Sequence, residues 1–403
     1  MELERTMEPT IKKISRGFPI LLLTGLRQIG KTFLLEKIKE PGRKYVSLDF
    51  PDDRELARNR PDLFFQRYEP PILIDEVQYA PELFTYIKIY ADIHQKNGLF
   101  WLTGSQKFGL MKGIQESLAG RVAILDMLGL SYREMVKQPK NVPFLPSMTG
   151  HHSDLKPLKL HDLYKVICKG SFPRLVVHRG ENREIFFRSY LQTYIQRGVK
   201  DYQGANQEVK FYQFICAAAA RTGSLLNYTD LARDSDIDVR TAKTWLSTLE
   251  RSGLVKLLYP YYVNVTKRLI KTPKLYFMDT GLCAFLSGFN TPESLEAGSL
   301  NGAILETWAF AEILKSYWHN GKDPSIYFYR DADQREIDFV IEQDMTLYPI
   351  EVKKTSAPGA DSAKHFPLLE KLKKPVGTGA VLCLRPSALP LNDNAIAMPV
   401  WGI

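Results

Sequence analysis

The chain has 403 residues, of which 44% are hydrophobic, 11% aromatic and 25% charged. This composition is typical of a soluble protein with two to four domains, and it excludes disordered, collagen-like and disulfide-scaffold chains. The net charge of +9 is unevenly spread, because residues 151–300 carry 21 basic and 14 acidic side chains whereas residues 301–403 carry 11 and 13. The basic middle favours a polyanionic partner such as DNA, although a merely solvated basic surface would give the same counts.

No apolar run approaches the roughly 18 residues that a membrane-spanning helix needs, and no signal-peptide pattern is present. The cysteines stand far apart and form neither a zinc pattern nor a CxxC pair. They are Cys168, Cys216, Cys283 and Cys383. We therefore expect reduced, buried thiols and a cytoplasmic protein without membrane contact.

The first 135 residues alternate short apolar runs with amphipathic stretches. Apolar runs without polar alternation predict parallel strands that helices cover on both faces. The expected strands are residues 20–23, 45–48, 72–74, 99–102 and 122–128, and the expected helices include 33–39 and 83–94. The sequence thus predicts an α/β domain over residues 1–137.

A phosphate-binding motif stands between the first of these strands and the helix that follows it. Its pattern is GxxxxGK[ST], and its residues are Gly25, Leu26, Arg27, Gln28, Ile29, Gly30, Lys31 and Thr32. The glycines let the loop curl so that backbone N–H groups point at phosphate oxygens. Lys31 is expected to reach the β- and γ-phosphates of ATP, and the Thr32 hydroxyl to bind Mg²⁺. The flanking strand and helix distinguish the motif from a chance glycine turn.

Two carboxylates, Asp75 and Glu76, end the expected strand 72–74. In P-loop enzymes an Asp at this position holds the Mg²⁺ shell, so Asp75 takes that role. Glu76 is then placed to orient or deprotonate the attacking water. It is Glu76 that makes hydrolysis, rather than binding alone, the predicted activity.

Polar side chains after the next strand suggest further contacts with the nucleotide. Thr103 and Ser105 either sense the γ-phosphate or cap the following helix, and the sequence does not separate these alternatives. Arg121 stands at a later helix-to-strand corner. It is expected to enter a neighbouring subunit's site as an arginine finger, and otherwise it is a surface arginine.

Together, the segments GLRQIGKT (25–32), ILIDE (72–76), LTGS (102–105) and ESLAGR (116–121) resemble prokaryotic AAA+ superfamily P-loop ATPases. The resemblance covers essentially the whole chain, including residues 170–173 and 190–199. It implies ATP, Mg²⁺, a homo-oligomer, a winged-helix region and a C-terminal domain similar to PD-(D/E)xK nucleases. One departure is Arg197-Gly198-Val199 in place of the more usual Arg-Asp-Val run, and Arg197 is therefore left out of the expected site.

The middle of the chain divides into a proline-rich linker with a helical region, 138–222, and a winged-helix-like domain, 223–298. Residues 228–233 and 239–251 are expected to form two helices, with Asp238 as the N-cap of the second. The second helix would present Arg240, Lys243, Thr244 and Ser247 outward, as a DNA-reading helix does. Two strands, residues 255–263 and 274–278, are expected to follow as a wing with Lys267, Arg268 and Lys271 at its tip. The alternative is that these elements only pack against the ATPase.

The C-terminal region, 299–403, is expected to form an α/β nuclease-like domain. Glu306 lies on an expected helix, Asp338 on a strand, and Glu351 and Lys353 two apart on the next strand. Residues two apart on a strand share a face, and Asp338 can meet them across the hairpin. The three carboxylates would hold Mg²⁺, and Lys353 would stabilise charge on a scissile phosphate. The same residues also fit an exposed strand or a binding platform that does not cleave.

Two functions therefore follow from the sequence. The first is a Mg²⁺-dependent ATP hydrolase that acts on DNA through the winged helix and the nuclease-like domain. The second is a regulatory ATPase switch whose nucleotide state controls a protein partner, with no DNA cleavage.

Overall fold

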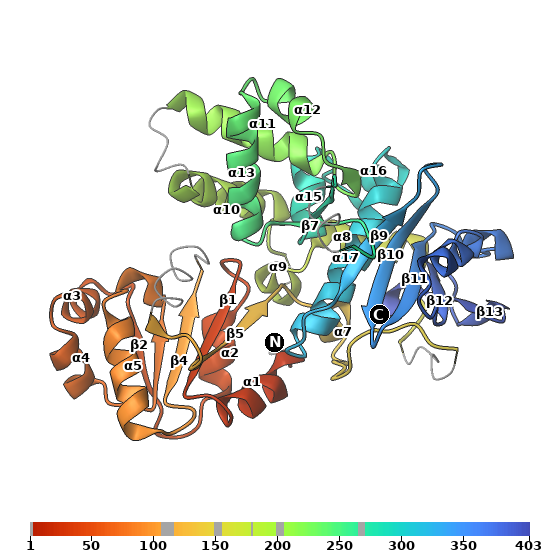
Figure 1. Ribbon diagram of the computed structural model, residues 1–403. Coiled ribbons are helices and arrows are strands. Elements are labelled where there is room, and N and C mark those ends of the chain that lie inside the picture. Colours follow the sequence, from red (N-terminus) through yellow and green to blue (C-terminus); the bar gives the residue numbers. More distant parts are fainter. Residues whose placement is uncertain (1–2, 106–116, 149–154, 179, 199–204, 265–270) are drawn as a thin grey trace.

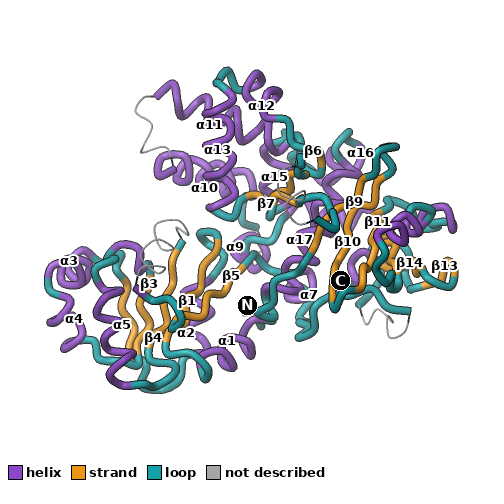
Figure 2. Tube along the Cα trace, viewed as in Figure 1, coloured by secondary structure: helices purple, strands orange, loops and turns teal. Residues whose placement is uncertain are grey.

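The structure is a computed structural model that describes residues 3–105, 117–148, 155–178, 180–198, 205–264 and 271–403. Figure 1 shows three regions: an N-terminal domain, a mainly helical middle, and a C-terminal domain built on a second sheet. Figure 2 shows how the strands of these regions are distributed among the helices.

The N-terminal domain has a five-stranded, all-parallel sheet with the order β2-β3-β4-β1-β5. Its strands are β1 (Ile20–Gly25), β2 (Lys44–Ser47), β3 (Ile72–Asp75), β4 (Phe100–Gly104) and β5 (Val122–Met127). Its helices are α1 (Met7–Ser15), α2 (Lys31–Ile38), α3 (Pro51–Asn59), α4 (Pro61–Arg67), η1 (Val77–Tyr79), α5 (Leu83–His94) and α7 (Tyr132–Met135). The α/β fold predicted from the apolar runs is confirmed.

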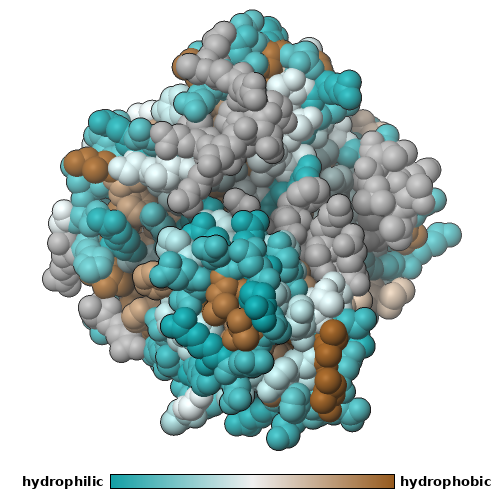
Figure 3. Space-filling model, turned by 90° about the vertical axis from the view of Figure 1, so that its left-hand side faces the viewer, coloured by the Kyte–Doolittle hydropathy of each residue, from teal (hydrophilic) through white to brown (hydrophobic). Residues whose placement is uncertain are grey.

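The sheet is buried on both faces because alternate side chains of each strand point to opposite sides. Leu21 and Leu23 of β1 join one hydrophobic core, whereas Ile20 and Leu22 join another. Parallel strands all end at the same edge, and ligands of such sheets bind outside the carboxyl ends of the strands. The described residues on the left-hand side of the molecule in Figure 1 form a largely hydrophilic surface with small separate hydrophobic patches (Figure 3).

The middle region places helices above the N-terminal domain (Figure 1). Its helices are α8 (Leu160–Lys169), α9 (Pro173–Val177), α10 (Arg183–Gly198), α11 (Ala205–Ala219), α12 (Tyr228–Asp234), α13 (Val239–Arg251), α15 (Thr280–Leu286) and α16 (Pro292–Ala297). A small three-stranded sheet has the strand order β6-β8-β7, and its strands are β6 (Ser224–Leu225), β7 (Val255–Leu258) and β8 (Lys274–Phe277). Asp238 caps α13 by accepting a hydrogen bond from the Thr241 N–H at 2.9 Å, as the sequence predicts.

The C-terminal domain has a six-stranded sheet with the order β13-β14-β12-β11-β10-β9. Its elements are α17 (Asn301–Trp318), β9 (Ile326–Arg330), β10 (Glu336–Gln343), β11 (Thr346–Val352), η2 (Ala360–Ala363), η3 (Phe366–Leu372), β12 (Gly379–Cys383), β13 (Leu389–Asn392), β14 (Ala395–Pro399) and η4 (Val400–Gly402). The four cysteines are free; Cys168, Cys283 and Cys383 are buried, but Cys216 is only half-buried.

Helix α17 connects the C-terminal and N-terminal domains. Its Glu312 accepts the backbone N–H of Tyr132 at 2.8 Å, and its Lys315 donates to the carbonyl of Leu130 at 3.0 Å. Just past its end, His319 lies 3.4 Å from the buried carboxylate of Glu134. These contacts fix the segment after β5, and therefore one side of the N-terminal sheet, to the helix that carries Glu306.

Candidate functional site: the phosphate-binding loop and its carboxylates

The loop between β1 and α2 needs glycine at both of its glycine positions. Gly25 has φ +144°, and a Cβ there would lie 2.2 Å from the carbonyl oxygen of Met127. Gly30 has φ +90° and is the N-cap residue of α2. Side-chain-bearing residues rarely adopt these conformations, so the glycines set the path of the loop and aim the helix N-terminus at its concave side.

Lys31 is buried at the start of α2, with its ammonium group turned into the loop. It donates to the carbonyl oxygens of Gly25 at 3.1 Å and Leu26 at 2.8 Å, and to the hydroxyl of Ser105 at 3.0 Å. Burial lowers the pKa of Lys31 to about 8, against the opposing effect of the carboxylates of Glu76 and Asp75. The ammonium group of Lys31 therefore lies on the inner side of the loop, where it can bind phosphate oxygens.

Asp75 lies at the carboxyl end of β3 between two threonine hydroxyls. The Thr32 hydroxyl donates to its Oδ1 at 2.6 Å, and the Thr103 hydroxyl donates to the same oxygen. Thr32 and Asp75, predicted from the sequence as Mg²⁺ ligands, are thus adjacent. Their hydroxyl and carboxylate oxygens are donors of the kind that Mg²⁺ prefers.

Glu76 follows β3 in the left-handed conformation, with φ 55° and ψ 46°. Such a conformation costs a non-glycine residue of order 1 kcal/mol, and it is concentrated at functional sites. Its backbone N–H donates to Thr103 Oγ1 at 3.1 Å, and its side chain accepts from the Ser105 hydroxyl at 2.8 Å. The hydroxyls of Thr103 and Ser105 therefore bind the two carboxylates and Lys31. The alternative that they cap a following helix concerns residues from 106 onward, and residues 106–116 lie outside the described residues.

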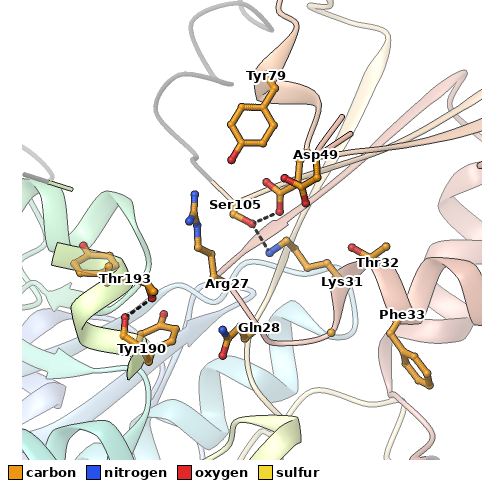
Figure 4. A pocket seen from close by; sticks show the side chains of 13 residues that line it. Arg27, Gln28, Lys31, Thr32, Phe33, Asp49, Tyr79, Ser105, Tyr190 and Thr193 are labelled. Atoms are coloured by element: carbon orange, nitrogen blue, oxygen red, sulfur yellow. Dashed lines mark hydrogen bonds between the residues drawn. The ribbon is translucent and has the colours of Figure 1, made fainter. Parts of the chain in front are cut away.

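These groups open into a cavity of about 490 Å³ (Figure 4). In Figure 4 Arg27 extends from the loop into the cavity, with Lys31 on one side and α10 on the other. Residues that the sequence had not assigned to the site also line it: Asp49, Tyr79, Tyr190, Thr193 and Tyr194. Asp49 follows β2, so the rule that parallel strands end at one edge could have found it.

An apolar cavity of about 630 Å³ adjoins the first, with Gln28, Gly30 and Phe33 common to both. Its other lining residues are Leu3, Arg5, Ile29, Leu34, Lys37, Leu130, Pro173, Arg174, Val177 and His178. They come from the chain before α1, from the phosphate loop and α2, from the segment after β5, and from α9 and the residue after it. The sequence motifs did not indicate this cavity because its apolar residues come from segments far apart in the chain.

Arg121, the expected arginine finger, does not line either cavity. Its guanidinium forms a two-pronged ion pair with Asp92 of α5, at 2.5 and 3.1 Å. The pair lies on the surface, with Arg121 about one-third and Asp92 less than half exposed. Within one chain, then, Arg121 is bound away from the phosphate loop.

The C-terminal residues lie near one another, but they do not form the expected metal shell. Lys353 pairs with Glu351 at 2.7 Å, and Asp338 accepts the backbone N–H of Val352 at 2.8 Å. Glu306 is instead bound by Lys274 and Tyr276 of β8. In the part of the chain that the structure describes, no three His, Cys, Asp or Glu side chains could hold a metal ion together. In this structure lysines and a backbone amide bind these carboxylates, and the Glu306–Asp338–Glu351 metal site stays a prediction.

Comparisons with known proteins define the class of the N-terminal domain. Residues 17–136 match the family model described as an AAA domain, and residues 160–293 and 301–403 match models described as domains of unknown function (DUF8612 and DUF4143). With its all-parallel sheet and phosphate loop, the N-terminal domain has a P-loop NTPase fold and is similar to AAA domains. Among the helices that the structure describes, none is long and apolar enough to span a membrane.

Relatives and solved structures match much of the chain. An uncharacterized protein of Mycobacterium tuberculosis is 25% identical over 385 residues, covering 94% of this chain and 80% of the relative. An uncharacterized protein of Methanocaldococcus jannaschii is 24% identical over 298 residues, covering 64% of this chain and 60% of the relative. The Walker-type ATPase PABY2304 of Pyrococcus abyssi aligns with a TM-score of 0.41 and 14% identity, covering 70% of this chain and 94% of that one. The Thermotoga maritima RuvB Holliday junction branch migration motor aligns at 0.30 and 12%, covering 63% and 89%.

Proposed function

We propose that the protein binds ATP at the phosphate loop and hydrolyses it with Mg²⁺. The observation that carries the proposal is the hydrogen-bonded chain Thr32–Asp75–Thr103 beside Lys31–Ser105–Glu76. It brings a phosphate-binding cation, a pair of Mg²⁺-type oxygen donors and a carboxylate base to one edge of the sheet. The chemistry of phosphoryl transfer is mostly positioning and charge stabilisation, which these groups supply.

Each residue then has a defined task. Lys31 releases the loop carbonyls and binds the β- and γ-phosphate oxygens, while the N–H groups of the loop cradle them. Thr32 and Asp75 would hold Mg²⁺, which when bound neutralises charge on the phosphates. Glu76 accepts the proton of the attacking water, and Ser105, which binds both Glu76 and Lys31, holds the base next to the γ-phosphate.

Arg27 is proposed to contact the γ-phosphate from the same chain. Its half-buried side chain lines the cavity, and among the described residues it has no hydrogen-bond or ion-pair partner. Lys31, Glu76 and Ser105 are by contrast already bound to one another. An unpaired guanidinium facing a phosphate site is suited to stabilise charge that develops in the transition state.

The adjoining apolar cavity is proposed to take the adenine base. It shares Gly30 and Phe33 with the cavity of about 490 Å³ at the phosphate loop, which we call the phosphate cavity. A mostly apolar lining with a few polar groups is typical of nucleotide-base pockets. Pro173 and Val177 of α9 line this cavity, and Tyr190 and Tyr194 of α10 line the phosphate cavity. A bound nucleotide would therefore touch the middle region, which supports a nucleotide-controlled change there.

ATP affinity is expected to fall as pH rises above about 8. Burial lowers the pKa of Lys31 to about 8 in the free protein, and phosphate binding needs the protonated form. Each pH unit above that value should therefore weaken binding by up to about tenfold. Titration with ATP and Mg²⁺ between pH 7.5 and 9.5 measures this. A Lys31→Met variant should bind weakly with a flat profile, and a flat profile in the parent would contradict the assignment.

DNA binding by the middle region is a second candidate function. The elements follow in the order α11, β6, α12, α13, β7, β8, which is the order of a winged helix. Arg240, Lys243 and Thr244 of α13 are exposed, as a DNA-reading helix requires, whereas Ser247 is half-buried and bound to Arg251. Lys271 of the expected wing tip is exposed, and Lys267 and Arg268 lie outside the described residues.

Replacing Arg240 and Lys243 by alanine should weaken DNA binding and its dependence on salt. Two lost phosphate contacts should lower the slope of log affinity against log salt by about 2. Fluorescence anisotropy with duplex DNA measures the slope. The matched control is Lys12→Ala with Lys13→Ala, which removes the same charge from the exposed side of α1. If both double variants give the same slope, α13 does not contact DNA through Arg240 and Lys243. The function of the middle region would then be that of the regulatory ATPase switch, without DNA contact.

A further inference from the structure

Lys274 occupies an unusual position for a lysine. It begins β8, yet only 5% of its side chain is exposed, although lysine is almost never buried unless it is paired. Its ammonium group lies 2.6 Å from Glu336 Oε1 and 3.1 Å from Glu306 Oε1. Its partners belong to β10 and α17 of the C-terminal domain. A strand of the middle sheet thus places a cation among carboxylates of the C-terminal domain.

A second side chain of β8 supports the same contact. Tyr276, two residues further along the strand and fully buried, donates its hydroxyl to the same Glu306 oxygen. Its ring packs on Phe310 of α17 with centroids 4.5 Å apart. Residues two apart on a strand share a face, so one face of β8 is committed to α17 and β10. The strand that the sequence assigned to a DNA-contacting wing is here an element of the domain interface.

Lys274 lies among several carboxylates of the C-terminal domain. Burial opposes its charge, but the carboxylates of Glu306, Glu336 and Asp338 raise the pKa of Lys274 above its ordinary value. Burial and the nearby Asp338 carboxylate raise the pKa of Glu306 to about 7, and Lys274 and Tyr276 oppose that rise. Glu351 has its own cation in Lys353. Two lysines thus bind two of the three carboxylates that the sequence assigned to a metal ion, Glu306 and Glu351.

We propose that Lys274 is the resident cation of this acidic cluster, so that the cluster locks the middle sheet onto the C-terminal domain and does not act as a metal-dependent nuclease site. A divalent ion at Glu306 would have to displace the ammonium group. That displacement would leave Lys274 with Glu336 as its remaining close carboxylate, and removing one of the two partners of a buried lysine is unfavourable. The proposal is independent of ATP hydrolysis at the phosphate loop.

The test compares the full-length parent with Lys274→Met, which keeps the length of the side chain but removes its charge. We expect Lys274→Met to melt several degrees lower, because Glu306 and Glu336 lose their cation. The matched control is Lys271→Met, which removes the charge of an exposed lysine three residues away and should melt like the parent. The double variant Lys274→Met with Glu306→Gln should recover part of the loss, because the unpaired carboxylate is gone.

Metal binding gives the second readout, and it does not depend on the Lys274 variants folding. Isothermal titration with Mn²⁺ should give the same result for the parent and for Asp338→Asn, because no metal binds at the cluster. Incubation of DNA with Mg²⁺ or Mn²⁺ should show no cleavage that Asp338→Asn abolishes. A Mn²⁺ site or a nicking activity that is present in the parent and lost in Asp338→Asn would overturn the proposal. So would a Lys274→Met variant that melts like the parent.

Discussion

Replacing Arg27 by alanine is expected to slow ATP hydrolysis by about 10³-fold or more, the range found when an arginine finger is lost. The guanidinium stands in the phosphate cavity without a partner among the described residues, so a bound γ-phosphate would be its first anionic contact. The effect should fall mainly on turnover, because a contact that strengthens in the transition state changes kcat more than binding. Single-turnover phosphate release at saturating ATP measures it.

Arg121→Ala is the matched comparison. Its guanidinium is bound to Asp92 at the surface, so its loss should leave turnover within a few-fold of the parent. The sequence alone predicts the opposite, with Arg121 acting on a neighbouring subunit's nucleotide. If that arrangement holds, Arg121→Ala is the slow variant, and mixing it with Lys31→Ala subunits restores part of the activity. Slow turnover of Arg121→Ala with normal turnover of Arg27→Ala would contradict the assignment to Arg27.

Glu76→Gln is expected to keep ATP binding while lowering kcat by about 10²- to 10⁴-fold. The amide cannot accept the proton of the attacking water, but it preserves the shape of the side chain and can still bond to Ser105. ATP affinity from equilibrium titration and kcat from steady-state phosphate release separate the two effects. A Glu76→Gln variant that turns over ATP at the parent rate would remove Glu76 as the base.

The nucleotide site shows what local sequence can and cannot predict. The loop Gly25–Thr32 and the strand end at Asp75 are contiguous motifs, and the structure brings them together with Thr103 and Ser105. Thr103 and Ser105 remained ambiguous because a hydroxyl after a strand also caps helices. The strand order of the sheet removes the ambiguity about their position. Because β4 lies between β3 and β1, the end of β4 that carries Thr103 and Ser105 lies between Glu76 and Lys31.

Side chains from distant segments could not be found in the same way. Tyr190 and Tyr194 reach the phosphate cavity only because α10 folds over it, and no motif near them signals a nucleotide. In the sequence, Lys274 is only one basic residue at the start of the second strand of the expected wing. Its burial against Glu306 depends on how β8 packs on α17, which is a tertiary contact between residues 32 positions apart. The lysines that bind Glu306 and Glu351 could not be assigned to them in advance, because local spacing gives no sign of an internal cation.

The most direct measurement for the proposed function is phosphate release from ATP by the purified protein, with and without Mg²⁺, beside a Lys31→Ala variant. We predict steady release that needs Mg²⁺ and disappears in Lys31→Ala. Ser105 and the loop carbonyls hold the Lys31 ammonium group, and apart from Arg27 no described residue that lines the cavity has a cationic side chain to replace it. A folded parent protein that binds no ATP, or release that persists unchanged in Lys31→Ala, would contradict ATP hydrolysis at this site.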